Sequence, residues 1–287
     1  MATEKPNLFL LASSLLAGCV LAGVAYAAVM SRSDSLLTAR RPLPPSAVTA
    51  TTDPAVIARG AHLISIMGCT TCHGADLAGG HLNVVGAPYD PPNLSRRIGR
   101  MSDAELDRAV RGGLKPDGTT EVAMPSHSYV TLSNDEARSI VSDLRTVAPK
   151  GSDAPDPAPG FLLRAYLSLG FFKTEAAELA SARPPLDAGD KVEAGRHLAA
   201  ISCGRCHGAD LGGIKGMGPD MTVRGYYNRQ QFFALMRKGE MIAEGNTELM
   251  AQASKSTFVN FSDAEIDQIY AYLNARDRIL AAKPPQH

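Results

Sequence analysis

The sequence contains no tryptophan, few other aromatic residues and only five cysteines among its 287 residues. Lys and Arg together number 29, as do Asp and Glu, so the formal net charge is zero. This balance argues against a broad basic surface and therefore against a nucleic-acid-binding protein. Four of the cysteines fall in two close pairs, whereas a disulfide-stapled secreted domain distributes its cysteines over distant elements. With 45% apolar and 20% charged residues, the chain is expected to fold around packed cores.

Each close pair of cysteines is followed at once by a histidine, in C-T-T-C-H at 69–73 and in C-G-R-C-H at 203–207. C-x-x-C alone fits a zinc site or a redox-active dithiol. The added histidine makes it the attachment pattern of c-type haem, whose porphyrin bonds to both sulfurs while the imidazole ligates the iron. Zinc remains the alternative, but two cysteines and one histidine leave a tetrahedral site one ligand short. The prediction is two covalently bound haem c groups, held by Cys69, Cys72, Cys203 and Cys206, with His73 and His207 on iron.

The segments around the two clusters repeat. G-A-H-L precedes the first cluster and G-R-H-L the second, and H-G-A-D-L follows both. A period above 100 residues is too long for a solenoid and indicates tandem domains. A bound haem in each core would also account for the lack of tryptophan. The expected division is an anchor or signal at 1–31, a linker at 32–52, a first cytochrome c domain at 53–150, an interdomain linker at 151–189 and a second cytochrome c domain at 190–287.

Helix signals dominate both repeats, and strand signals are weak. Three S-x-x-E capping boxes predict helix starts, because the serine hydroxyl accepts from a free amide while the glutamate reaches back to the cap. They begin at Ser102, Ser133 and Ser262. The expected fold class is all-α: two tandem cytochrome c-like haem domains behind an N-terminal transmembrane helix.

The stretch from Leu8 to Met30 carries no charge. At 1.5 Å per residue it reaches roughly 34 Å as a helix, enough to cross a bilayer core. By the positive-inside rule, the arginines that follow it would put this flank of the helix in the cytoplasm. The domains beyond it are expected to carry haem c chemistry, which takes place outside the cytoplasm. We therefore prefer the opposite orientation. Two alternatives stay open: a signal peptide cleaved after Ala27, and a lipoprotein signal modified at Cys19. All three indicate export.

The second axial ligand of each iron is expected to be a methionine. Met124, in A-M-P-S-H, lies on a loop before the last helix of the first repeat, with His127 as its competitor. Met250, in E-L-M-A, is expected at the equivalent loop position of the second repeat, with Met241 as its competitor. The carbonyls of Pro92 and Pro219 are candidate acceptors for the other ring nitrogen of each ligating histidine. Residues His62 and His197, ahead of the clusters, are interpreted as structural or surface histidines.

The chain resembles tandem class I cytochromes c, and more closely the multihaem cytochrome subunits of membrane-bound bacterial dehydrogenases that oxidise alcohols, sugars or aldehydes. The resemblance rests on P-P-N-L-S at 91–95, G-G-L-K-P-D-G at 112–118, V-A-M-P-S-H-S-Y at 122–129, L-M-A at 249–251 and the apolar segment 160–173. It covers roughly residues 53–276.

The resemblance implies electron transfer rather than catalysis. It implies a dihaem cytochrome anchored in the bacterial inner membrane, with its haem domains in the periplasm, relaying electrons from a dehydrogenase or quinol-linked donor to a respiratory-chain acceptor. Its partners would be membrane-bound dehydrogenase or oxidase subunits and, through the N-terminal helix, membrane lipid; no nucleic acid is expected. Two alternatives remain: a dihaem subunit of a cytochrome oxidase, and a dihaem peroxidase with one iron open to substrate.

Overall fold

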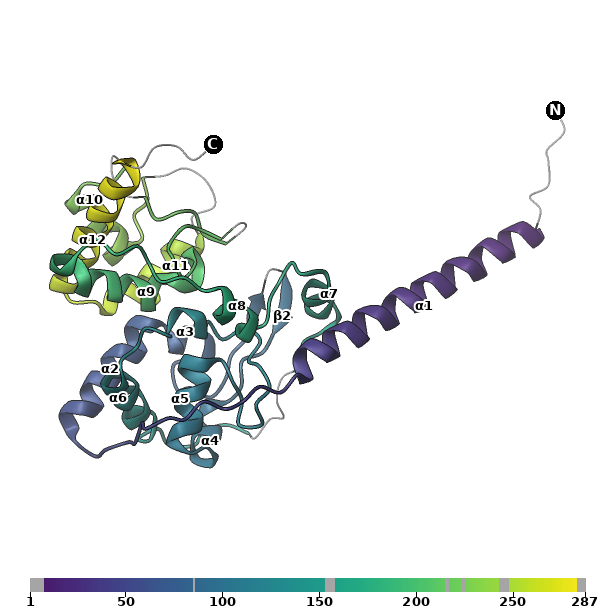
Figure 1. Ribbon diagram of the computed structural model, residues 1–287, viewed down its shortest axis with the longest axis horizontal. Coiled ribbons are helices and arrows are strands. Elements are labelled where there is room, and N and C mark those ends of the chain that lie inside the picture. Colours follow the sequence, from purple (N-terminus) through teal and green to yellow (C-terminus); the bar gives the residue numbers. More distant parts are fainter. Residues whose placement is uncertain are drawn as a thin grey trace.

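The computed structural model describes residues 8–84, 86–152, 158–214, 217–222, 226–242 and 248–282. A long N-terminal helix projects from a body made of two helical lobes (Figure 1). We call the lobes the first unit, residues 53–150, and the second unit, residues 190–282. The helices outside the units are α1 (Leu8–Thr38), α7 (Phe161–Leu169) and α8 (Glu175–Ser181).

Among its described residues, the first unit contains five α-helices, two 3₁₀ turns and a hairpin. Its elements are α2 (Pro54–Met67), α3 (Cys69–His73), β1 (Leu82–Val84), β2 (Ala87–Tyr89), α4 (Leu94–Arg97), η1 (Ile98–Arg100), α5 (Asp103–Gly112), η2 (Ser126–Ser128) and α6 (Asn134–Leu144). The second unit follows the same order without a named hairpin in the part that is described. Its elements are η3 (Asp190–Val192), α9 (Glu193–His207), α10 (Arg229–Lys238), α11 (Glu248–Ser256), η4 (Phe258–Asn260) and α12 (Asp263–Ala282).

The antiparallel hairpin of β1 and β2 was not expected from the sequence, and it adds strand to an otherwise helical chain. It forms where an apolar, β-branched stretch is followed by Gly86, whose φ of 84° is open mainly to glycine. Ala87, at the start of β2, is buried against α7. The fold is therefore mostly helical, as expected, with one small sheet.

In each unit the first helix crosses the last helix at a glycine. A Cβ on Gly60 would lie 2.0 Å from the carbonyl oxygen of Ser139, and one on Gly195 would lie 1.9 Å from that of Gln268. Only glycine permits so close an approach of two helices. Gly60 and Gly195 occupy the same place in G-A-H-L and G-R-H-L, so the sequence repeat is also a repeat of helix packing.

The three expected capping boxes are confirmed. In the first unit, Ser102 pairs with Glu105 at the start of α5 and Ser133 with Glu136 at the start of α6. In the second unit the Ser262 amide donates to Glu265 over 2.7 Å, and the Glu265 amide donates to the Ser262 hydroxyl over 3.2 Å. The S-x-x-E pattern therefore predicts the starts of α5, α6 and α12 correctly.

The segment expected as an extended linker at 32–52 lies against the first unit. Helix α1 continues to Thr38, beyond the expected end of the apolar segment. Further along, Val48 is buried in the main core, and the Ala50 and Thr51 amides donate to side chains of the first unit, over 2.7 Å to Asp103 and 3.0 Å to Ser142. The chain is thus fixed to the first unit before α2 begins.

The segment at 151–189 is likewise docked on the first unit. Leu163 and Leu167 of α7 form a small apolar cluster with Ala87 and Val122. At the start of α8, the buried Glu175 accepts from the amide of His127 over 3.1 Å. Both helices therefore pack on the first unit, although they lie outside its residue range.

Among the described residues, one helix is long and apolar enough to cross a membrane. Its candidate span is Ala12–Thr38, and none of its most apolar window is buried within the protein. A signal sequence near the N-terminus has the same properties. The length and composition of α1 are those of a membrane anchor and equally those of a signal sequence.

Candidate haem sites

The chain takes the same path after each cysteine cluster. The Gly79 amide donates to the carbonyl of His73 over 2.9 Å, and the Gly213 amide donates to that of His207 over 2.8 Å. Both glycines have positive φ, 106° and 93°, a conformation that side chains disfavour. This loop folds the chain back over each histidine.

The loop ends by fixing each histidine ring. The Nδ1 of His73 lies 3.1 Å from the carbonyl oxygen of Pro92, and the Nδ1 of His207 lies 2.6 Å from that of Pro219. Because a carbonyl only accepts, Nδ1 must carry the proton in both contacts. Burial lowers the pKa of both histidines and so favours the neutral ring. Each Nε2 is then left with a lone pair available to a metal.

One thiol of each cluster lacks the low pKa of a redox-active cysteine. Burial raises the pKa of Cys69 and of Cys203 to about 12, whereas reactive cysteines are those with a depressed thiol pKa. Within the described ranges, no group of three or more His, Cys, Asp or Glu side chains is arranged to hold a metal ion. Neither the dithiol nor the zinc interpretation gains support.

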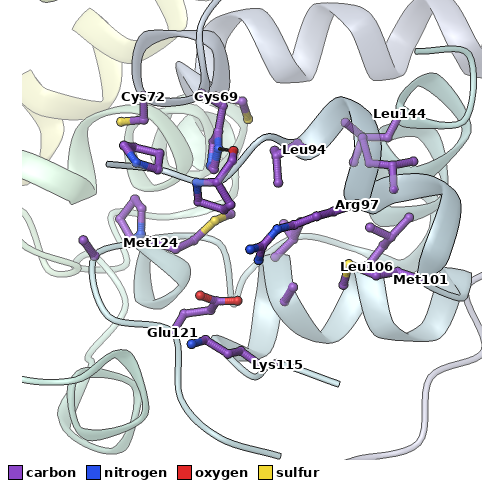
Figure 2. A pocket seen from close by; sticks show the side chains of 18 of the residues that line it. Cys69, Cys72, Leu94, Arg97, Met101, Leu106, Lys115, Glu121, Met124 and Leu144 are labelled. Atoms are coloured by element: carbon purple, nitrogen blue, oxygen red, sulfur yellow. Dashed lines mark hydrogen bonds between the residues drawn. The ribbon is translucent and has the colours of Figure 1, made fainter. Parts of the chain in front are cut away.

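A cavity of about 740 Å³ opens beside the first cluster. Figure 2 shows Cys69 and Cys72 at one end, Lys115 and Glu121 at the other, and Met124 between them. The wall is mainly apolar, and its aliphatic members include Leu82, Leu94, Ile98, Leu106, Val110 and Leu144.

This cavity fits haem c in volume, polarity and donor set. Its size is that of a cofactor pocket, and it brings together two cysteine sulfurs, the ring of His73 and the thioether of Met124. Arg97, Arg100 and Lys115 also line it, and cations of this kind pair with carboxylates such as the two haem propionates. Sequence reasoning missed Arg97 and Arg100, since neither belongs to a motif.

His127, the competitor of Met124, is engaged elsewhere. Its Nδ1 lies 3.0 Å from a carboxylate oxygen of Glu175, which is buried. Burial opposes the charge of His127, yet the hydrogen bond and the charge of Glu175 raise its pKa. His127 does not line the cavity, whereas Met124 does. The geometry favours Met124.

The second unit differs from the sequence expectation at Met250. The residue lies in helix α11 and not on a loop, because the E-L-M-A-Q-A-S-K run has strong helix propensity. Met250 and Met241 are both half-buried and pack against the same apolar core. Parts of the surrounding loops, at 215–216, 223–225 and 243–247, lie outside the described residues. The choice between the two methionines stays a prediction.

The two cysteine clusters meet at the contact between the units. The Oγ1 of Thr71, inside the first cluster, lies 3.0 Å from that of Thr257 in the second unit. Arg205, inside the second cluster, lines the cavity of the first unit. A Cβ on Gly68 would lie 2.7 Å from the guanidinium of Arg205.

The pKa of Cys72 reflects this proximity. Burial raises it, the nearby Cys206 raises it further, and Arg205 lowers it. Sequence reasoning missed Arg205, because the middle positions of C-x-x-C-H are unrestricted.

The same contact contains two matching histidine–glutamate pairs. His62 of the first unit lies 2.7 Å from Glu265 of the second, and His197 of the second lies 2.8 Å from Glu136 of the first. His62 and His197 are equivalent in the repeat, as are the two capping-box glutamates. Their interpretation as structural histidines is supported, and each holds the opposite unit.

Two comparisons with known proteins found related sequences. Residues 190–273 match the family model described as cytochrome c oxidase, cbb3-type, subunit III. The chain is also 27% identical over 176 residues to the cytochrome c subunits of the quinone alcohol dehydrogenases of Gluconacetobacter polyoxogenes and Komagataeibacter europaeus. The matched region covers 56% of this chain and 37% of each relative. The protein thus carries a cytochrome c family domain, a type that binds haem c covalently, and is distantly related to dehydrogenase cytochrome subunits.

Proposed function

We propose that this chain is a membrane-anchored dihaem cytochrome c of the bacterial inner membrane, with both units in the periplasm. It relays electrons from a dehydrogenase or other quinol-linked donor to a respiratory-chain acceptor and catalyses no reaction of its own. The observation that carries the proposal is the repeated histidine geometry. Both rings follow a C-x-x-C pair, both donate Nδ1–H to a proline carbonyl, and both leave Nε2 for a metal.

The residues of the chain have distinct roles in this proposal. When bound, haem c supplies a one-electron iron couple. The four cluster cysteines would attach the two groups, and His73 and His207 would each give a ring nitrogen to an iron. Met124 would add a thioether ligand in the first unit and Met250 in the second, with Met241 as the alternative. A thioether ligand raises the potential and occupies the position that a substrate would need.

The contact between the units supports the relay. It places Thr71, Arg205 and the cysteines of both clusters in one region. The two attachment sites are therefore close in space although far apart in sequence. An arrangement of this kind suits the passage of an electron from one unit to the other without a diffusing carrier.

The partner is proposed from the comparisons. The relatives are cytochrome c subunits of quinone alcohol dehydrogenases, which favours a dehydrogenase as donor. The name of the family model matched at 190–273 favours a second candidate, a subunit of a cytochrome oxidase. Co-purification from detergent-solubilised membranes separates the two, because dehydrogenase and oxidase subunits differ in mass and cofactor.

Haem stoichiometry tests the core of the proposal. Denatured, acetone-extracted protein should retain two haems per chain, and the Cys69→Ala/Cys72→Ala and Cys203→Ala/Cys206→Ala variants should each retain one. Cys19→Ala is the matched control and should retain two. A ratio of one in the unmodified chain, or colour that leaves with the solvent, would contradict the dihaem assignment. Carbon monoxide binding by the unmodified, reduced protein would favour a peroxidase-like open iron instead.

A further inference from the structure

Helix α7 is apolar on both of its faces. Leu163 and Leu167 are buried against the first unit, at 0% and 3% exposure. On the opposite side Phe161 is 52% exposed and Leu169 is 65% exposed, and Phe171, just after the helix, is 76% exposed. A cluster of exposed large apolar side chains marks an interaction surface.

This surface adjoins the candidate membrane span. The ring of Phe161 stacks on that of Tyr26 in α1, with centroids 5.4 Å apart and planes inclined by 16°. Ser168 donates to the carbonyl of Val29 over 2.8 Å, and the guanidinium of Arg164 pairs with Asp34. Figure 1 shows α7 beside the end of α1 that enters the body. The two helices are thus joined along about two turns of α1.

The contact lies at the depth of a membrane surface. The uncharged run of α1 ends at Met30, and Tyr26 precedes that end by four residues, or about 6 Å along a helix. Helices that lie in a membrane surface bury their apolar face about 5–10 Å into the boundary between headgroups and acyl chains. If α1 crosses the bilayer, Phe161 reaches this boundary without any change in the structure.

We infer that α7 and Phe171 form a second membrane contact, in which Phe161, Leu169 and Phe171 insert into the lipid surface next to the exit of α1. The inference rests on the proposed membrane span of α1. The occupant is lipid because the surface continues the lipid-facing side of α1, with Tyr26 and Phe161 shared between them. Tyr26, near the end of the span, is also typical of membrane interfaces, where tyrosine and tryptophan are enriched.

The contact would fix the orientation of the first unit on the membrane. α7 is joined to β2 and to the loop before Met124 through Ala87 and Val122, and Tyr89 of β2 lines the haem cavity. A single spanning helix leaves the body free to rotate about its axis. Two attachment points hold one side of the first unit toward the membrane, where membrane-bound partners are found.

Lipid-borne photolabelling of the haem-loaded full chain tests the inference. The chain is placed in nanodiscs of phosphatidylcholine and phosphatidylglycerol that contain a diazirine phospholipid, and labelled residues are mapped by mass spectrometry. Hydroxyl-radical footprinting on the same sample identifies side chains exposed to water. We expect lipid label on α1 and on 161–171, and water oxidation but no lipid label at Val259, which is 46% exposed in the second unit.

Charge introduced on the exposed face of α7 sharpens the test. In a Leu169→Glu/Phe171→Glu variant, 161–171 should lose its lipid label while α1 keeps its own, and a Val259→Glu control should change neither. The haem spectrum reports that each variant has folded. Label confined to α1 in the unmodified chain, with 161–171 oxidised from water, overturns the inference, as does label that persists in the charged variant. Absence of label from α1 itself refutes the proposed membrane span instead.

Discussion

The contact between His197 and Glu136 should stabilise the packing of the two units measurably, and a double-mutant cycle will show it. Burial opposes ionisation of Glu136, but the hydrogen bonds from His197 and Ser133 outweigh it and lower its pKa from 4.5 to about 2. At about 1.4 kcal/mol per pKa unit, the lowering corresponds to roughly 3 kcal/mol of stabilisation of the charged form. Ser133 contributes part of this, and solvent screens part of the rest. The share of His197 is therefore expected to be about 1–2 kcal/mol.

The cycle combines His197→Ala, Glu136→Gln and the double variant, with urea unfolding followed by circular dichroism. The chain supplies a matched control in His81 and Asp90. These side chains lie 2.6 Å apart but are 92% and 62% exposed, against 24% and 11% for His197 and Glu136. Exposed pairs contribute little, so the coupling free energy of His81 and Asp90 should be near zero.

The pH dependence of the coupling has a definite sign. Because the pKa of folded Glu136 lies below its usual value, its contribution is complete above about pH 4.5 and is lost as the pH falls toward about 2. The coupling between His197 and Glu136 should therefore be larger at pH 6 than at pH 2.5. A coupling no larger than that of His81 and Asp90, or one that increases on acidification, would show that the reasoning from burial is wrong.

Three further outcomes are expected. Met124→Ala and Met250→Ala should each make one haem high-spin and able to bind carbon monoxide, as seen in the absorption spectrum; an unchanged spectrum for Met250→Ala would refute that ligand assignment. Gly60→Ala and Gly195→Ala should each lower the free energy of unfolding by about 2–3 kcal/mol, since the new Cβ meets a backbone carbonyl of the last helix, and denaturant titration will measure this. Arg205→Gln should lower the reduction potential of the first haem, because a nearby positive charge favours the reduced iron; a redox titration in which neither potential moves would contradict the placement of Arg205.

The parts of the structure that followed from the sequence are those governed by short-range rules. The capping box at Ser133 and Glu136 depends on residues three apart, and the carbonyl that Pro92 offers to His73 lies in a loop that the sequence marks with prolines. By contrast, the helical setting of Met250 was missed because it was inferred by alignment with Met124, although local propensity favoured a helix.

The parts that did not follow from the sequence depend on contacts between distant residues. His62 and Glu265 are 203 positions apart, and no local pattern predicts their contact. The docking of α7 was also not predicted, because a mostly apolar stretch of nine residues fits a buried helix, a linker or a surface helix equally well. Its second, exposed apolar side became visible only once Leu163 and Leu167 were placed against the first unit.

The two carboxylate oxygens of each capping glutamate explain how one residue serves both its own helix and the opposite unit. In Glu136, Oε2 accepts from the amide and hydroxyl of Ser133, and Oε1 accepts from His197. Glu265 divides its oxygens in the same way between Ser262 and His62. The contact is therefore self-complementary, as in a two-fold symmetric dimer, although both halves belong to one chain. Such an arrangement combines the residues that begin the last helix of each unit with a histidine on the first helix of the opposite unit. It follows that the repeat of G-x-H-L and S-x-x-E within this chain encodes the packing of the two units as well as the fold of each one.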